Sequence, residues 1–175
     1  MLWIMAGNHP VAGDRMKIAF IAHLSEVSGA GVALVDTAVA FQEVGHKVWL
    51  VLPGAGDLAG RAWDRGVNAV IVPNPEVALT DASLGARGRL LRARADYVGR
   101  LRRFLSESRV DVAYVNSSAS VFAGAAARLS RVPIVWHVHE TLDSHDRRTR
   151  VKKWLISRLA DRLVYASNSA VEHFP

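Results

Sequence analysis

The sequence has no cysteine, no long apolar run and no low-complexity tract. Without cysteine, disulfides and cysteine-ligated metal sites are both excluded. No segment approaches the roughly 18 consecutive apolar residues that span a bilayer. The apolar start, residues 1–5, is too short for the core of a signal peptide and has no basic leader. These absences are compatible with the reducing cytoplasm, which is the location we expect.

The chain does have enough apolar residues for one core. Half of its 175 residues are apolar, and a chain of this length ordinarily forms one domain that buries roughly 70% of its unfolded surface. Disorder as a whole is therefore excluded. The first strong apolar run begins at residue 17. We expect residues 1–16 to be a disordered extension and residues 17–168 to form a single domain.

The net charge of +6 is concentrated in residues 87–109 and 147–153. In the first segment, leucines and aromatic residues recur at helical spacing, which predicts an amphipathic helix with a basic outer face. Such a face can simply be solvated, or it can attract an anionic membrane, each basic residue contributing on the order of 1 kcal/mol. Nucleic acid is not an expected partner, because no stacking platform or recognition motif accompanies the charge.

Short apolar runs alternate with helical patterns along the chain. The runs expected as strands are residues 18–24, 47–52, 67–72, 111–115, 133–138 and 162–166. The segments expected as helices are residues 32–44, 58–65, 87–109, 118–129 and 150–160. The apolar runs are continuous, which is typical of parallel strands covered on both faces. We therefore predict an α/β fold, a doubly wound, mostly parallel Rossmann-like sheet with helices on both faces.

Ligands of such sheets bind at the carboxyl ends of the strands. After the first strand, Ser28, Gly29 and Ala30 open a helix whose free amides and dipole suit an anion such as a diphosphate. Gly29 would let the backbone approach a ligand, or the loop could simply need a positive φ angle. Leu34 stands where a dinucleotide fingerprint needs glycine, and a Walker loop is excluded because no Lys-Ser or Lys-Thr pair follows.

Polar residues also follow the fourth and fifth strands. Asn116 could bond a sugar or cap the next helix, and Ser117 adds a hydroxyl at the same strand end. After the fifth strand, an uncharged His139 could donate a hydrogen bond to a sugar hydroxyl or a phosphate. Glu140 could orient a hydroxyl group of a ligand or cap a loop. Both strands therefore contribute candidate binding residues at one edge of the sheet.

The neighbouring histidines are weighed separately. We expect His137 to be structural and to point away from His139, which requires a bend or a strand end near Val138, because residues two apart on a strand share a face. Together with His145, these two histidines could suggest a metal site. No carboxylate or further histidine stands at an established ligand spacing, so we expect no metal.

Four segments in order resemble glycosyltransferase family 4. Residues 28–48 are similar to its N-terminal signature: a glycine pair, whose first position is Ser28 here, an apolar helix bearing Asp36, and Gly-His-x-Val. Residues 111–118 look like its fourth strand and polar exit. Residues 132–140 look like its fifth strand, which ends in His-Glu, and residues 160–170 like its last strand before the interdomain crossing. The resemblance spans about residues 17–175.

The resemblance implies the N-terminal domain of a retaining glycosyltransferase of the two-Rossmann-domain (GT-B) type. Such an enzyme transfers a sugar from a nucleotide sugar to an acceptor, and no cofactor is expected. His139 would be catalytic, and Glu140 and Ser117 would bind the acceptor. The residues that would bind the donor's phosphate or sugar are Ser28, Gly29, Ala30 and Asn116.

The family's second domain holds the nucleotide sugar, so we expect residues 169–175 to begin a crossing to a C-terminal domain and this chain alone to be inactive. The alternative is a non-catalytic Rossmann-like module that binds a phosphorylated or sugar ligand or a partner protein. The acceptor cannot be read from the sequence, because loops such as residues 73–83 vary freely on one fold.

Overall fold

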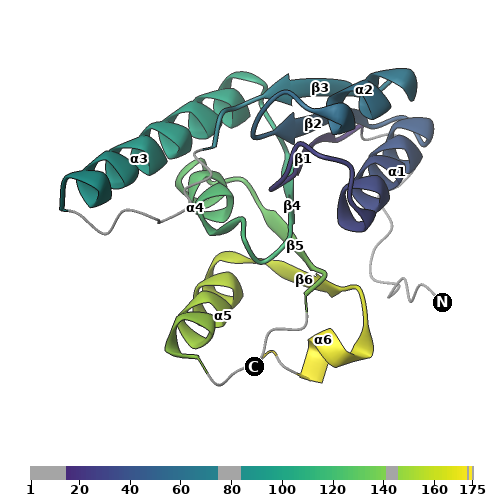
Figure 1. Cartoon of the computed structure of the whole chain (residues 1–175). Helices are drawn as coiled ribbons and strands as arrows, with labels where there is room; N and C mark the ends of the chain where they lie inside the picture. Colours follow the sequence, from purple (N-terminus) through teal and green to yellow (C-terminus); the bar gives the residue numbers. More distant parts are fainter. Residues whose placement is uncertain (1–14, 75–83, 141–145, 173, 175) are drawn as a thin grey trace.

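The computed structural model describes residues 15–74, 84–140, 146–172 and 174 (Figure 1). Within them, six strands form one sheet in the order β3-β2-β1-β4-β5-β6, and every neighbouring pair is parallel. The strands are β1 (Lys17–Ile21), β2 (Lys47–Leu52), β3 (Asn68–Ile71), β4 (Val112–Asn116), β5 (Ile134–Val138) and β6 (Arg162–Tyr165). The strand order reverses between β1 and β4, which is where such sheets bind ligands.

Helices connect the strands and cover both faces of the sheet (Figure 1). They are α1 (Gly29–Glu43), α2 (Asp57–Asp64), α3 (Leu84–Glu107), α4 (Val121–Leu129), α5 (Arg147–Leu159) and α6 (Asn168–Glu172). Every element expected from the sequence is present, and the predicted doubly wound sheet with helices on both faces is confirmed. The short α6 was not expected.

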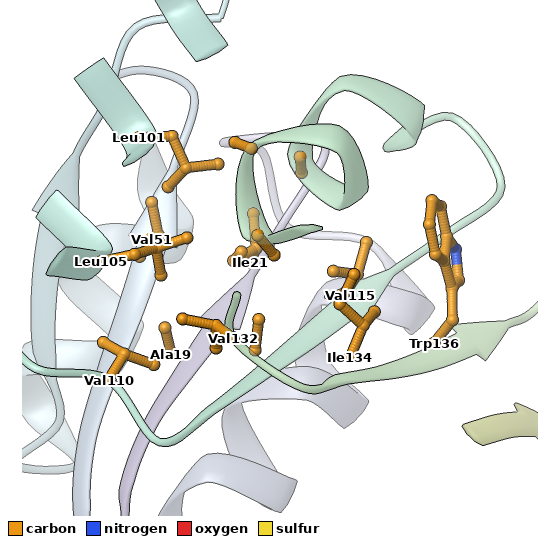
Figure 2. Packing of buried hydrophobic residues seen from close by; sticks show 14 of the residues in the cluster. Ala19, Ile21, Val51, Leu101, Leu105, Val110, Val115, Val132, Ile134 and Trp136 are labelled. Atoms are coloured by element: carbon orange, nitrogen blue, oxygen red, sulfur yellow. The ribbon is translucent and has the colours of Figure 1, made fainter. Parts of the chain in front are cut away.

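Two separate cores follow from the alternation of side chains along the strands. Ile18 and Phe20 of β1 pack under α1 and α2. Ala19 and Ile21 pack on the other face, with Leu101 of α3 and the inner side of α4 (Figure 2). Each large side chain buried in this way stabilises the fold by roughly 1.5–3 kcal/mol.

The predicted amphipathic helix is confirmed in α3. Its inward residues Leu90, Tyr97, Leu101 and Leu105 are buried, while Leu91 is 66% exposed. Across the same core, α4 packs tightly on β5. A Cβ atom at Gly124 would overlap the ring of the buried Trp136, so the approach of this helix to the sheet depends on glycine.

The boundaries differ from expectation at two helices near the sheet's carboxyl edge. Helix α1 begins at Gly29, three residues before the predicted start, because Ser28 caps it. Helix α4 begins at Val121 and not at residue 118, because Ser117 adopts a φ of 75° and starts a turn first. A side-chain cap therefore sets the start of α1, and a backbone turn sets the start of α4; the apolar pattern registers neither.

Some expectations fall outside the described residues. Residues 1–14, residues 75–83 and His145 are not described. The disordered extension stays a prediction, and so does the crossing to a second domain from residues 169–175. Met16, by contrast, packs on the core, and its carbonyl accepts the Lys47 amide at 2.9 Å. None of the helices in the described residues contains an apolar stretch that could span a bilayer.

Candidate functional site

The first component of the site is the start of α1. Ser28 is extended, with φ −138° and ψ 163°, and its hydroxyl oxygen accepts the Gly31 amide at 3.1 Å. This is an N-cap, and the first turn of α1 contains no acidic residue. The amides of Gly29 and Ala30 have no acceptor within the helix. They and the positive end of the helix dipole can therefore receive an anion.

Gly29 is not needed for the fold of the loop. Among the described glycines, positive φ angles occur at Gly45 and Gly66, so the interpretation that Gly29 serves a left-handed turn is wrong. Its position is exposed, and an added Cβ would meet nothing within 4 Å. The glycine instead leaves open space beside the first turn of α1, and its predicted role in admitting a ligand stays a prediction.

The loop before α1 is anchored by the loop after β2. Ser25 is buried, its hydroxyl donates to the Gly54 carbonyl at 2.9 Å, and its own carbonyl accepts the Leu58 amide at 3.0 Å. A Cβ at Gly56 would overlap the backbone of Ser25. Sequence reasoning missed this anchor, although a serine placed directly after a strand exit was a usable signal.

Asn116 joins the start of α1 to the loop after β5. Asn116 is the last residue of β4 and is 1% exposed. The Oδ1 atom lies 2.7 Å from Nε2 of His139, and Nδ2 donates to the carbonyl of Ala30 at 3.4 Å. Three residues assigned to the site from the sequence, from three different loops or strand ends, are thus brought together.

Ser117 and Glu140 form a second pair beside the first. The Ser117 hydroxyl donates to one carboxylate oxygen of Glu140, and the Ser118 amide donates to the other at 3.0 Å. Burial alone would raise the pKa of Glu140, but these hydrogen bonds lower it below its ordinary value. The carboxylate therefore holds the turn between β4 and α4. Whether either residue also binds an acceptor stays a prediction.

His137 and His139 lie on the same side of β5. Their ring centroids are 3.9 Å apart, so the expectation that the two point in opposite directions is wrong. Strand alternation holds up to Val138, where β5 ends. The Nδ1 atom of His137 lies 2.8 Å from the hydroxyl of Tyr114. Burial, helped by the charge of His139, lowers the pKa of His137 to about 4, so this ring is neutral at pH 7.

A third histidine, His23, was missed by sequence reasoning. It follows β1 by two residues at the same edge of the sheet, a position that could have marked it. Burial lowers the pKa of His139, Glu140 raises it, and the charge of His23 lowers it further. His139 is therefore a mainly neutral imidazole at pH 7. Within the described residues, no group of three or more His, Cys, Asp and Glu could hold a metal ion.

Comparisons with known proteins identify the family and the fold. The family model for Glycosyltransferase Family 4 matches residues 27–174. No curated protein matches the sequence. HepE of Anabaena, in complex with UDP-glucose, is 22% identical, with a TM-score of 0.71 over 91% of this chain and 40% of its own. MurG of Acinetobacter baumannii is 17% identical, with a TM-score of 0.66 over 91% of this chain and 43% of its own.

One similar structure is named as an enzyme of another reaction class. A putative UDP-N-acetylglucosamine 2-epimerase of Listeria monocytogenes is 11% identical, with a TM-score of 0.64 over 91% of this chain and 42% of its own. At such identities the likeness shows the fold alone, and a shared fold does not determine a shared reaction. This chain spans less than half the length of each of these proteins.

Proposed function

The chain belongs to glycosyltransferase family 4, and we propose that it is the N-terminal, acceptor-side domain of a retaining GT-B transferase. The enzyme would move a sugar from a nucleotide sugar to an acceptor, and it would need a second, donor-binding domain. Two observations support this proposal. HepE structures contain UDP-glucose, UDP with glucose, or UDP, and this chain spans 40% of the HepE chain.

One observation carries the proposal: the first turn of α1, Asn116 and His139 meet where the strand order reverses. Free amides at a helix start suit the phosphates of a nucleotide sugar. A mainly neutral imidazole beside them can exchange hydrogen bonds with an uncharged sugar. The site thus offers one end for negative charge and another for hydroxyl groups, which are the two parts of such a donor.

In this proposal, Ser28, Gly29 and Ala30 contact the donor's phosphates, and His139 lies beside the transferred sugar as the catalytic residue. Ser117 and Glu140 face the acceptor side. No metal or other cofactor is proposed, because the helix start supplies the positive potential that the phosphates need.

A titration of this chain with UDP-glucose, followed by amide NMR, tests the proposal. We expect weak binding, with the largest shifts at Gly29, Ala30 and His139. Micromolar affinity would contradict the assignment of the donor to a second domain. Shifts confined to other surfaces would favour a non-catalytic module. Joined to a donor-binding domain, the chain should support transfer with retained anomeric configuration.

We also propose a cytoplasmic location and a peripheral contact with anionic membranes through residues 87–109. The outer face of α3 supports this contact: Arg92, Arg100, Arg102 and Arg103 are exposed on it. Arg94 instead lies over the ring of Phe122, 4.7 Å from the ring centroid. Arg87 lies in α3, but its side chain is outside the described part of the chain.

Vesicle sedimentation tests this contact against a second basic surface. Helix α5 exposes Arg147, Arg148 and Arg150, and Trp154 is 57% exposed there. Binding to phosphatidylglycerol vesicles should be strong at low salt and fall as the screening length shortens to about 8 Å at physiological ionic strength. Replacing three exposed α3 arginines by alanine should abolish it, and the matched α5 triple variant should not. The reverse result would move the contact to α5.

A further inference from the structure

The two hydrogen bonds of Asn116 determine which way its amide group points. An asparagine side chain has an oxygen that only accepts and an NH₂ group that only donates. The carbonyl of Ala30 can only accept, so the NH₂ group must face it, at 3.4 Å. The reverse orientation would bring two oxygens together. Because Asn116 is 1% exposed, solvent has almost no access to relieve that contact.

The orientation of Asn116 in turn fixes the proton on His139. With the NH₂ group turned to Ala30, the oxygen Oδ1 faces Nε2 of His139 at 2.7 Å. An oxygen acceptor at that distance requires a hydrogen on Nε2. Because burial keeps this imidazole mainly neutral at pH 7, its second nitrogen, Nδ1, then carries a lone pair.

We propose that Asn116 is a positioning residue that holds His139 as the Nε2–H tautomer, so that Nδ1 accepts a hydrogen bond from a hydroxyl group of the ligand. The identity of this hydroxyl as one of a sugar rests on the proposed function. The proposal revises two sequence expectations. Asn116 acts through His139 instead of bonding the sugar, and His139 receives a hydrogen bond where it was expected to donate one.

The surroundings of His139 favour this role. The ring of His137 packs against the His139 ring, with centroids 3.9 Å apart, and limits its rotation. The His139 ring bonds Asn116 through Nε2, so Nδ1 is the nitrogen on the other side of the ring. A phosphate oxygen without a proton would be repelled by the lone pair on Nδ1. The amides of Gly29 and Ala30, by contrast, attract a phosphate oxygen. The site therefore separates a phosphate end at α1 from a hydroxyl end at His139.

The tautomer can be measured directly in this chain, without activity. Ring nitrogen shifts of ¹⁵N-labelled histidine at pH 7.5 distinguish protonated from unprotonated nitrogens. We expect His139 to carry its proton on Nε2, with a scalar coupling across the hydrogen bond to the Asn116 side chain. A proton on Nδ1, or a mixture of both tautomers, would overturn the proposal.

Variants separate positioning from folding. In Asn116→Ala the tautomers should approach the mixture of free histidine, and the Nε2 proton should exchange with water roughly tenfold faster, as expected for the loss of one ordinary hydrogen bond. If Asn116→Ala does not fold, the tautomer measured in the wild-type chain still decides the proposal. Asn116→Asp cannot replace it, because its second carboxylate oxygen would face the Ala30 carbonyl. Ser117→Ala, one residue along, should leave the His139 tautomer unchanged.

Ligand probes test the hydroxyl class. UDP-glucose should shift the Nδ1 resonance of His139 in the direction of an accepted hydrogen bond, while UDP and inorganic phosphate should move mainly the amides of Gly29 and Ala30. An equal Nδ1 shift with phosphate alone would overturn the hydroxyl assignment. If UDP-glucose moves neither group although the Nε2–H tautomer is present, the proposed function fails and the positioning by Asn116 stands.

Discussion

Two adjacent side-chain pairs join the end of β4 to the end of β5, and each pair contacts a different part of the chain. Asn116 bonds His139 and reaches back to Ala30 at the start of α1. Ser117 bonds Glu140, and its own carbonyl accepts the indole N–H of Trp136 at 3.0 Å, under α4. The first pair therefore lies beside the start of α1, where the donor is proposed to bind, and the second pair holds the turn that leads into α4.

The comparison predicts that a change in the first pair affects activity and a change in the second affects stability. In the chain joined to its donor-binding domain, His139→Ala should lower kcat ten- to a thousandfold, since one oriented group at a developing charge is worth up to roughly 4 kcal/mol. The free energy of unfolding should fall by only about 1 kcal/mol, because a single buried acceptor, Oδ1 of Asn116, loses its donor. Steady-state kinetics and urea denaturation measure the two effects, and a large loss of stability with normal kcat would invert the comparison.

The second pair should show the opposite pattern. Glu140→Ala leaves the Ser117 hydroxyl and the Ser118 amide without their acceptor, so unfolding should become easier by roughly 2–3 kcal/mol at pH 7. The depressed pKa of Glu140 sets the pH dependence. Its stabilisation is present above the unfolded pKa near 4.5 and is lost as the pH falls through the folded value.

Urea melts of wild type and Glu140→Ala between pH 7 and pH 3 check this dependence. The two curves should converge at the acid end. If they stay parallel down to pH 3, the carboxylate charge is not what holds the turn. Ser118→Ala is a suitable control, because the bond that it contributes comes from the backbone amide and persists in the variant.

His137 belongs to neither pair, and its effect should appear only in the pH dependence of stability. Its folded pKa is about 4 and its ordinary value is 6.5, so between these values the unfolded chain binds more protons. Stability should therefore fall as the pH drops from 6.5 toward 4. Because the ring is only half buried, solvent screening reduces the contribution to the order of 1 kcal/mol.

The variant His137→Gln should flatten this slope between pH 7.5 and pH 5, where Glu140 stays ionised. Some slope should remain, because the pKa of His139 is lowered as well, and His23, Glu140 and Tyr114 still surround the site. An unchanged slope would mean that His137 is as easily protonated in the folded as in the unfolded chain.

The edge of the sheet that carries both pairs could be predicted from sequence, but the pairing could not. Continuous apolar runs gave the strands, and polar residues after them marked Asn116 and His139. The side-chain pairs, however, depend on the register between β4 and β5. In the structure Asn116 stands opposite His137, and nothing in the apolar pattern of either strand sets that register. The face shared by His137 and His139 did follow from alternation. The strand does end at Val138, and the error was to expect that this end turns the two rings apart.

Roles that depend on contacts between loops were also beyond the sequence. Glu140 could be an acceptor-binding residue or a cap from its type alone, and the structure shows it holding the turn at Ser117 and Ser118. The anchoring of Ser25 by the loop after β2 is likewise a contact between segments some 30 residues apart. Periodicity reports which face of an element is buried, and not which loop lies against it.

The smallest expected effect concerns His23, which influences both pairs through its charge. It lowers the pKa of His139 and that of Glu140. The variant His23→Gln should therefore raise both pKa values, that of His139 toward 6.5 and that of Glu140 toward 4.5, and both shifts should be small because His23 is the weakest of the causes. NMR titration of the His139 ring and of the Glu140 carboxyl carbon measures both shifts in one sample. If only His139 moves, His23 acts on the ligand-facing pair alone, and the two pairs are electrostatically separate. If both move together, the charge of His23 couples the group that faces the ligand to the group that holds the turn.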